Sequence, residues 1–212
     1  IYSFKNELAV QGQAGQIADG ASVRYVNSQG LEYNEAVIKS MIGALMVDQI
    51  LNHYLSVSRL DDGTNRADND AGILVDGESY TVMEHYWDEA YGYLFGGCDN
   101  AQDPIGESAC DDFLHKYLLR VNNDQDFEGI ETDIYEAFKR GRASISASNY
   151  EERDIAIAQL RRLISELIGI RAVYYLQQGR LAKENGQWGT AFHDLSEGYG
   201  FIFSLQFTRL SS

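Results

Sequence analysis

The chain has 212 residues and a formal net charge of −15, with 17 basic and 32 acidic side chains. This balance argues against nucleic-acid binding, because a protein that binds phosphates needs a footprint of lysine and arginine. Hydrophobic residues make up 44% of the chain and aromatic residues 12%, which is typical of a folded globule rather than a disordered tail. The single proline favours long uninterrupted helices.

The sequence predicts no transmembrane segment, because no stretch approaches the roughly eighteen consecutive apolar residues that a membrane-spanning helix needs. The chain starts at Ile1 without a methionine. We therefore interpret it as a mature or trimmed product, so the lack of a visible signal peptide excludes nothing.

The N-terminal part has no helical period. Residues 1–30 are rich in Gly, Gln, Ala and Ser, so we predict an N-terminal arm or loop there. Apolar residues then recur at helical spacing, which predicts a first helix over about 31–57. Gly43 within this helix would allow a neighbouring backbone to approach closely.

An acidic stretch follows at 59–79 and is predicted to be a long polar loop. Its composition is the most calcium-like in the chain, but it lacks the spacing of an EF-hand. A solvated acidic loop is therefore favoured over calcium binding.

Further helices are predicted at 81–94, 111–121, 127–146, 151–178 and 188–207. Thr81 is the expected N-cap of the first of these, with Glu84 completing a capping box. No segment shows the alternation and turn chemistry of a hairpin. The predicted fold is all-α, a helical bundle of about six main helices joined by long polar loops, with residues 31–212 as one bundle domain.

The two cysteines, Cys98 and Cys110, bracket a polar loop. Such a pair is typical of a disulfide and of an oxidising compartment. Two buried free thiols are the alternative. A zinc site is disfavoured because no second cysteine pair is present.

One motif occurs twice, at 85–95 and 193–203. The copies share His, Glu, Tyr, Gly and Phe in one register, at a separation of 108 residues. Chance seldom aligns such uncommon residues, so the repeat predicts an internal duplication and two related halves within the bundle.

In both copies the His and the Glu lie four residues apart and share one face of a helix. If the halves pack together, the two faces would supply imidazole and carboxylate ligands suited to iron, zinc, manganese or copper. The candidate ligands are His85, Asp88, Glu89, His193 and Glu197. The alternative is that each His–Glu pair is a hydrogen-bonded contact that orients helices in the core.

Two charged residues interrupt apolar helical segments, namely Asp48 and Arg171. Because charges seldom enter a core alone, we expect the two residues to form a buried ion pair or to contact the metal ligands and orient them without binding the ion. The alternative is that they line a pocket for an acidic ligand.

The chain resembles a family of bacterial surface or periplasmic proteins, often lipoproteins, that is related to the imelysin-like proteins. The resemblance rests on the sequence segments 83–93, 192–202, 43–49 and 137–143. The resemblance implies a duplicated helical bundle associated with bacterial iron uptake. The imelysin-like hallmark is Gly-x-His-x-x-Glu, and here Met83 and Ala191 replace its glycine.

These observations predict an extracytoplasmic, non-enzymatic protein that binds a metal ion or a small metal complex and is linked to iron acquisition. Its expected location is the periplasm or the cell surface, with a lipid anchor before processing. The second hypothesis is a surface structural or interaction module that contacts a protein partner. A metallopeptidase is the third, although the sequence lacks a His-Glu-x-x-His helix.

Overall fold

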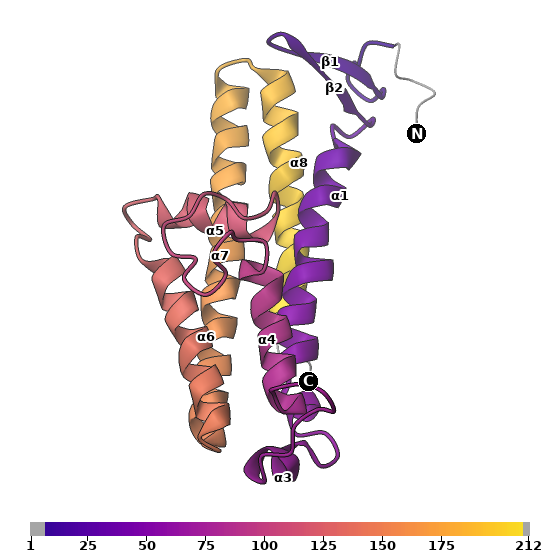
Figure 1. Ribbon diagram of the computed structural model, residues 1–212. Helices are drawn as coiled ribbons and strands as arrows, with labels where there is room; N and C mark the ends of the chain where they lie inside the picture. The colour runs from indigo at the N-terminus through magenta and orange to yellow at the C-terminus, as the bar shows by residue number, and fades with distance from the viewer. Residues whose placement is uncertain (1–6, 210–212) are drawn as a thin grey trace. The chain divides into compact units, whose positions relative to one another are not determined.

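The computed structural model describes residues 7–209, and these are predominantly helical (Figure 1). The elements are β1 (Gly15–Asp19), β2 (Ser22–Val26), α1 (Tyr33–Met41), the π-helical segments η1 (Ile42–Val47) and η2 (Gln49–Tyr54), α2 (Val57–Leu60), α3 (Asn65–Asp70), α4 (Val82–Phe95), α5 (Leu114–Asn122), α6 (Ile130–Ser146), α7 (Tyr150–Glu184), α8 (Trp188–Ser204) and the 3₁₀ turn η3 (Leu205–Thr208). The predicted all-α helical bundle is confirmed in its main feature. The duplication into two related halves stays a prediction, and the outer parts of the predicted arm and last helix, 1–6 and 210–212, lie outside the described residues.

The chain divides into two compact units, which are described separately. Unit 1 combines the residues up to Gly43 with Ile168–Gln206, and unit 2 combines Ala44–Leu167 with the residues from Phe207 onward. The long helix α7 contributes its first half to unit 2 and its second half to unit 1. Within residues 7–209, none of the helices combines the length and the apolar character needed to cross a lipid bilayer.

The predicted arm contains a β-hairpin, so the expectation that no hairpin is present is wrong. Strands β1 and β2 pair antiparallel, and the last pair joins Asp19 to Ser22. This leaves a two-residue loop that begins at Gly20, whose φ is 60°. Glycine is the residue that this first loop position favours, because other side chains rarely adopt a positive φ.

In unit 1, helices α1 and α8 run parallel and lie unusually close because α8 presents a row of small residues to α1 (Figure 1). The Ser196 hydroxyl accepts a hydrogen bond from the Glu32 N–H at 2.8 Å. One turn later, a Cβ placed on Gly200 would lie 2.5 Å from the Lys39 Cβ. We call Ser196, Gly200 and Ser204 the small-residue row.

Ser204 interrupts the hydrogen-bond ladder of the first long helix. In an α-helix the Gly43 N–H would bond to the Lys39 carbonyl. Here the Gly43 N–H donates to the Ser204 hydroxyl at 3.0 Å, and that hydroxyl donates to the Lys39 carbonyl at 2.7 Å. A side chain inserted in this way is a recognised cause of π-helical geometry, and η1 begins at Ile42. The helix predicted at 31–57 is therefore present, and the close approach expected at Gly43 is confirmed.

Unit 2 is organised around aromatic side chains of α4 and α6. Trp87 is 1% exposed, and its indole N–H donates to the Phe138 carbonyl at 3.0 Å. The predicted capping box at Thr81 and Glu84 is confirmed at the start of α4. A Cβ on Gly141 would lie 2.0 Å from the Trp87 ring, so the two helices meet at this glycine.

The segment predicted as a long acidic loop, 59–79, is partly helical, because α2 ends and α3 lies within it. These helices are too short and too polar to show an apolar period. Some of their acidic groups have structural partners. Asp61 Oδ1 lies 2.6 Å from the guanidinium of Arg153, which is fully buried.

The predicted disulfide between Cys98 and Cys110 is present. Two tyrosines fix the loop that it closes to the helices beneath. The Tyr91 hydroxyl of α4 donates to the Ala101 carbonyl, and the Tyr135 hydroxyl of α6 donates to the Gln102 carbonyl at 2.6 Å. The disulfide therefore joins the ends of this loop, and the two tyrosine hydroxyls fix Ala101 and Gln102 within it.

Substitution of Gly141 with alanine should lower the free energy of unfolding by about 1–3 kcal/mol, because the new methyl group would overlap the buried Trp87 ring. Gly92 on α4 is the matched control, since a Cβ there meets nothing within 4 Å. Gly92→Ala should raise stability by up to about 1 kcal/mol through helix propensity. Urea unfolding followed by tryptophan fluorescence measures both. Equal stabilities of the two variants would contradict the packing described here.

Replacement of both Cys98 and Cys110 with alanine should cost about 3 kcal/mol, because the bond closes a loop across a separation of 12 residues in the unfolded chain. Thermal unfolding with and without a dithiol reductant checks this expectation. The reductant should lower the melting temperature of the wild type and leave that of the double variant unchanged. A wild-type melting temperature insensitive to reduction would show that the loop is held without the bond.

Candidate functional site

A cluster of five charged side chains lies between α1 and α8 in unit 1, and the second motif copy supplies two of them. His193 Nδ1 lies 2.9 Å from Glu32 Oε2, and His193 Nε2 lies 3.7 Å from Glu197 Oε2. Lys39 Nζ lies 2.9 Å from Glu197 Oε1 and 3.1 Å from Glu35 Oε2. We call these five residues the His193 cluster.

Local sequence explains the placement of each member. Glu35 and Lys39 lie four residues apart and share one face of α1, and His193 and Glu197 do the same on α8. Glu32 immediately precedes α1, where its N–H is held by α8 through Ser196. The small-residue row thus brings the two charged faces together.

The cluster is largely removed from water. The side chains of Lys39 and Glu197 are each 9% exposed, and that of His193 is 18% exposed. The hydrogen bond with Glu32 raises the pKa of His193 above 6.5 and outweighs burial, which lowers it. Burial raises the pKa of Asp194 to about 6, although His193 acts in the opposite direction.

Negative charge exceeds positive charge around His193. The carboxylates are Asp19, Glu32, Glu35, Asp194 and Glu197, and the cations are Arg24, Lys39 and protonated His193. Five acidic groups therefore face three basic ones in a partly buried site. Such a site attracts a further cation, because unpaired charge is costly away from water.

Two overlapping groups in this cluster have metal-ligand character. One atom from each of Glu32, Glu35 and His193 lies within 4.8 Å of the others, and the same holds for His193, Asp194 and Glu197. In a tetrahedral site with bonds of about 2.0–2.2 Å, the ligand atoms lie roughly 3.3–3.6 Å apart. The side chains of either group would have to move closer together to reach this spacing, and an imidazole with carboxylates suits iron, zinc or manganese.

The first motif copy, in unit 2, has a different environment. The side chains of His85 and Glu89 are 41% and 42% exposed, with His85 Nε2 at 3.7 Å from Glu89 Oε1. The His85 ring stacks on Tyr80, with centroids 5.1 Å apart. Asp88 is paired with Arg142, whose Nε lies 2.9 Å from Asp88 Oδ1.

The glycines of the two copies differ as well. Gly200 lets α1 approach α8, whereas a Cβ added to Gly92 of the first copy would meet nothing within 4 Å. The tyrosines also diverge, since Tyr91 is hydrogen-bonded to the disulfide loop and Tyr199 is 53% exposed. The same motif thus performs different structural tasks at its two positions.

The predicted convergence of both copies on one ion stays a prediction, because His85 belongs to unit 2 and His193 to unit 1. The same holds for the proposed pairing of Asp48 with Arg171. Asp48 accepts a hydrogen bond from Asn52 within its own unit, at 2.9 Å. The Arg171 guanidinium lies over the Tyr174 ring, 4.2 Å from its centroid.

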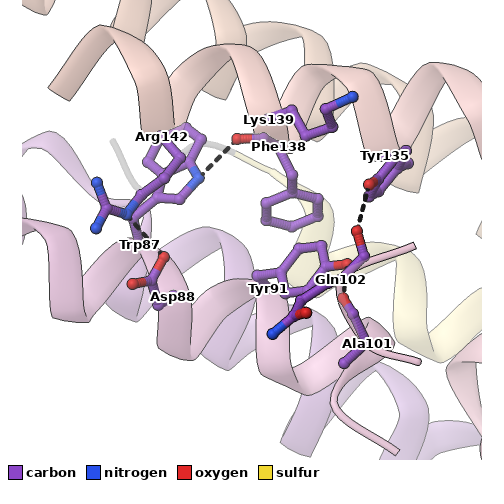
Figure 2. A pocket seen from close by; sticks show the side chains of 9 residues that line it. All are labelled: Trp87, Asp88, Tyr91, Ala101, Gln102, Tyr135, Phe138, Lys139 and Arg142. Carbon is purple, nitrogen blue, oxygen red and sulfur yellow. Dashed lines mark hydrogen bonds and ion pairs between the residues drawn. The ribbon is translucent and has the colours of Figure 1, made fainter. Parts of the chain in front are cut away.

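Asp88 lines a small pocket in unit 2, shown in Figure 2. The pocket has a volume of about 220 Å³, and its lining residues are Trp87, Asp88, Tyr91, Ala101, Gln102, Tyr135, Phe138, Lys139 and Arg142. Figure 2 shows aromatic rings of α4 and α6 facing each other, with the disulfide loop at one side and the Asp88–Arg142 pair at the other. The Asp88 carboxylate is therefore already paired with the Arg142 guanidinium.

Sequence reasoning identified His193 and Glu197 but missed Glu32, Glu35 and Asp194. Glu32 and Glu35 are three residues apart at the start of a predicted helix, which is a spacing that places two carboxylates on one face. That signal is weak by itself. It gains meaning only from the packing of α1 on α8, across about 160 residues of sequence.

Taken together, the fold and the site define a disulfide-bonded, mainly helical protein with a half-buried histidine–carboxylate cluster. The chain belongs to the family described as a domain of unknown function (DUF4856), which matches residues 1–212. Comparison with curated proteins finds no match, and comparison with solved structures finds none either.

Replacement of Glu84 with glutamine tests the charge network beside the pocket. Burial opposes the ionisation of Glu84, but hydrogen bonds from the Thr81 N–H, Ser146 and Arg142 outweigh it and hold its pKa below 4.5. The carboxylate therefore stabilises the fold above about pH 4.5, and this contribution is lost as pH falls through the folded-state pKa. We expect Glu84→Gln to cost about 1–2 kcal/mol at pH 7 and less on acidification.

Chemical unfolding between pH 3 and pH 7 measures this difference. Glu128→Gln is the control, because it makes the same change at an exposed glutamate. A stability difference between the wild type and Glu84→Gln that does not change with pH would contradict the assignment.

Proposed function

We propose that this protein binds a divalent transition-metal ion, without catalysis, through His193 and the carboxylates at one of its two ring nitrogens, either Glu32 with Glu35 or Asp194 with Glu197. The observation that carries the proposal is the position of His193, which lies between two carboxylates in a half-buried site. Both ring nitrogens face an acidic oxygen, so the imidazole can bind an ion through one nitrogen while a carboxylate orients it through the other. Metal-binding histidines are commonly oriented in this way.

The charge balance of the site supports the same proposal. A divalent ion that replaces the proton on His193 raises the local charge by one unit and leaves the site less negative than before. Metal binding should therefore release about one proton, and affinity should rise with pH through the range in which His193 loses its proton.

Lys39 gives the site a cation of its own. Its ammonium group contacts both Glu35 and Glu197, so an incoming ion competes with it for carboxylate oxygens. This competition weakens binding and favours exchange. A site of this kind suits a protein that takes up and releases metal rather than one that retains a permanent structural ion.

The disulfide supports a location in an oxidising compartment, such as the periplasm or the cell surface. The resemblance to imelysin-like proteins supports iron as the ion and iron acquisition as the process. The donor set is compatible with this choice and equally with zinc or manganese.

A second candidate function is a structural or interaction module in which the His193 cluster fixes α1 against α8. It is favoured by the contacts of Lys39, which bridges Glu35 of α1 and Glu197 of α8 without an ion. In that case the cluster is a buried ion-pair network, and partner binding takes place at another surface.

The decisive experiment compares metal binding by three proteins purified without chelator. Elemental analysis and titration calorimetry with Fe²⁺, Mn²⁺ and Zn²⁺ should give near-stoichiometric binding to the wild type. His193→Ala should bind at least tenfold more weakly, because it removes the only nitrogen ligand of the cluster. His85→Ala is the matched control, since it removes the corresponding histidine of the exposed motif copy, and it should bind like the wild type.

Lys39→Met separates the two candidate functions further. If the site holds a metal, removal of the competing ammonium should tighten binding while it destabilises the ion-free protein. Failure of the wild type to bind any of the three ions after loading, together with a lower melting temperature for His193→Ala, would establish the structural module instead. Equal loss of metal from His85→Ala and His193→Ala would show that the two motif copies share one ion.

A further inference from the structure

A groove in unit 1 lies between the β-hairpin and the beginning of α8. It has a volume of about 760 Å³, within the range of about 300–1,000 Å³ that is usual for small-molecule sites. Its walls come from residues 9–13, the hairpin with the segment that follows it, and the turn that joins α7 to α8. In Figure 1 these segments lie near one another at the end of α8 where that helix begins.

Aromatic side chains form one wall of the groove. Trp188, the first residue of α8, is 49% exposed. Its ring lies 6.2 Å from that of Phe192, at an interplanar angle of 34°. A half-exposed tryptophan leaves a large apolar surface in contact with water. This contact is unfavourable, and a ligand that covers the ring would remove it.

The rest of the lining combines apolar side chains, such as Val10, Ile17 and Val26, with polar side chains that carry no charge. Side-chain amides and a hydroxyl come from Gln11, Gln13, Asn27, Ser28, Gln29 and Gln187. None of the lining residues is charged, although the chain as a whole has a net charge of −15. Within residues 7–209, the side chains of Gln11, Ser28 and Gln187 make no hydrogen bond, so their donors and acceptors are open to a ligand.

The hairpin is fixed to α8, so the groove is preformed. A Cβ on Gly189 would lie 2.2 Å from the Ala18 carbonyl oxygen, which shows how closely the hairpin packs on the helix. The Thr190 hydroxyl donates to Asp19 at the end of β1. After the hairpin, Gly30 packs against the Phe192 ring of α8. A rigid groove loses little conformational entropy when it binds a ligand.

We infer that this groove binds a short neutral oligosaccharide. The apolar C–H face of a sugar ring packs on an exposed indole, and amide side chains supply both donors and acceptors for sugar hydroxyls. The lack of a lysine or arginine in the lining disfavours phosphorylated and acidic ligands, because their charge would have no partner. The inference is independent of the metal site, which uses other residues of the same unit.

The first test is a screen of the wild-type protein on an array of neutral and acidic glycans, followed by titration calorimetry with the neutral glycans that bind. The protein has 2 tryptophans, and Trp87 is buried, so a change in emission and protection from acrylamide quenching would report on Trp188. We expect binding of neutral oligosaccharides with protection of this tryptophan.

Two variants locate the binding. Trp188→Ala should weaken binding at least tenfold in calorimetry. Tyr199→Ala, which removes another exposed aromatic side chain of α8 outside the groove, should bind like the wild type. Circular dichroism of both variants checks that they fold.

Three results would overturn the inference. These are the absence of any neutral glycan that binds the wild type, equal affinity of the wild type and a folded Trp188→Ala, and a preference for acidic glycans over neutral ones. Because the metal ligands lie outside the groove, His193→Ala should retain glycan binding. Failure of the metal proposal and failure of this one are therefore distinguishable.

Discussion

The contact between α1 and α8 depends on residues of α8 that are too small to keep the two backbones apart. Ser196 and Ser204 each form hydrogen bonds with the backbone of the first helix, and Gly200 between them leaves no side chain at the crossing. The hydroxyl of Ser204 also replaces an internal hydrogen bond of that helix. The His193 cluster follows from this contact, because it forces the charged face of α1 against the charged face of α8 and away from water.

The two motif copies show how far the same residues can diverge when their surroundings differ. His193 lies beside a buried glutamate that immediately precedes another helix, whereas His85 pairs with Glu89 of its own helix near the surface and stacks on a tyrosine. A helical repeat specifies which side chains share a face. It does not specify what that face meets, and the chemistry of an imidazole depends mainly on the latter.

Local features of this protein were accessible from the sequence, whereas distant contacts were not. The capping box at Thr81, the disulfide and most helices follow from signals within a few residues. The hairpin was also local and was missed, because its Gly20-Ala21 turn lies in a segment where no strong alternation was recognised. Glu32 and Glu35 could not be assigned to the site, because nothing in their own neighbourhood indicates that α8 covers them.

The order of the segments along the chain has a consequence for biosynthesis. Unit 2 is nearly contiguous, but unit 1 joins the beginning of the chain to its end, and the hydrogen bond from Glu32 to Ser196 spans 164 positions. On a ribosome, the residues of unit 2 emerge before α8 exists, so α1 has no helix to pack against while they fold. During that interval the charged face of α1 stays in water. Helix α1 therefore precedes unit 2 along the chain but is buried against α8 only after most of unit 2 has emerged.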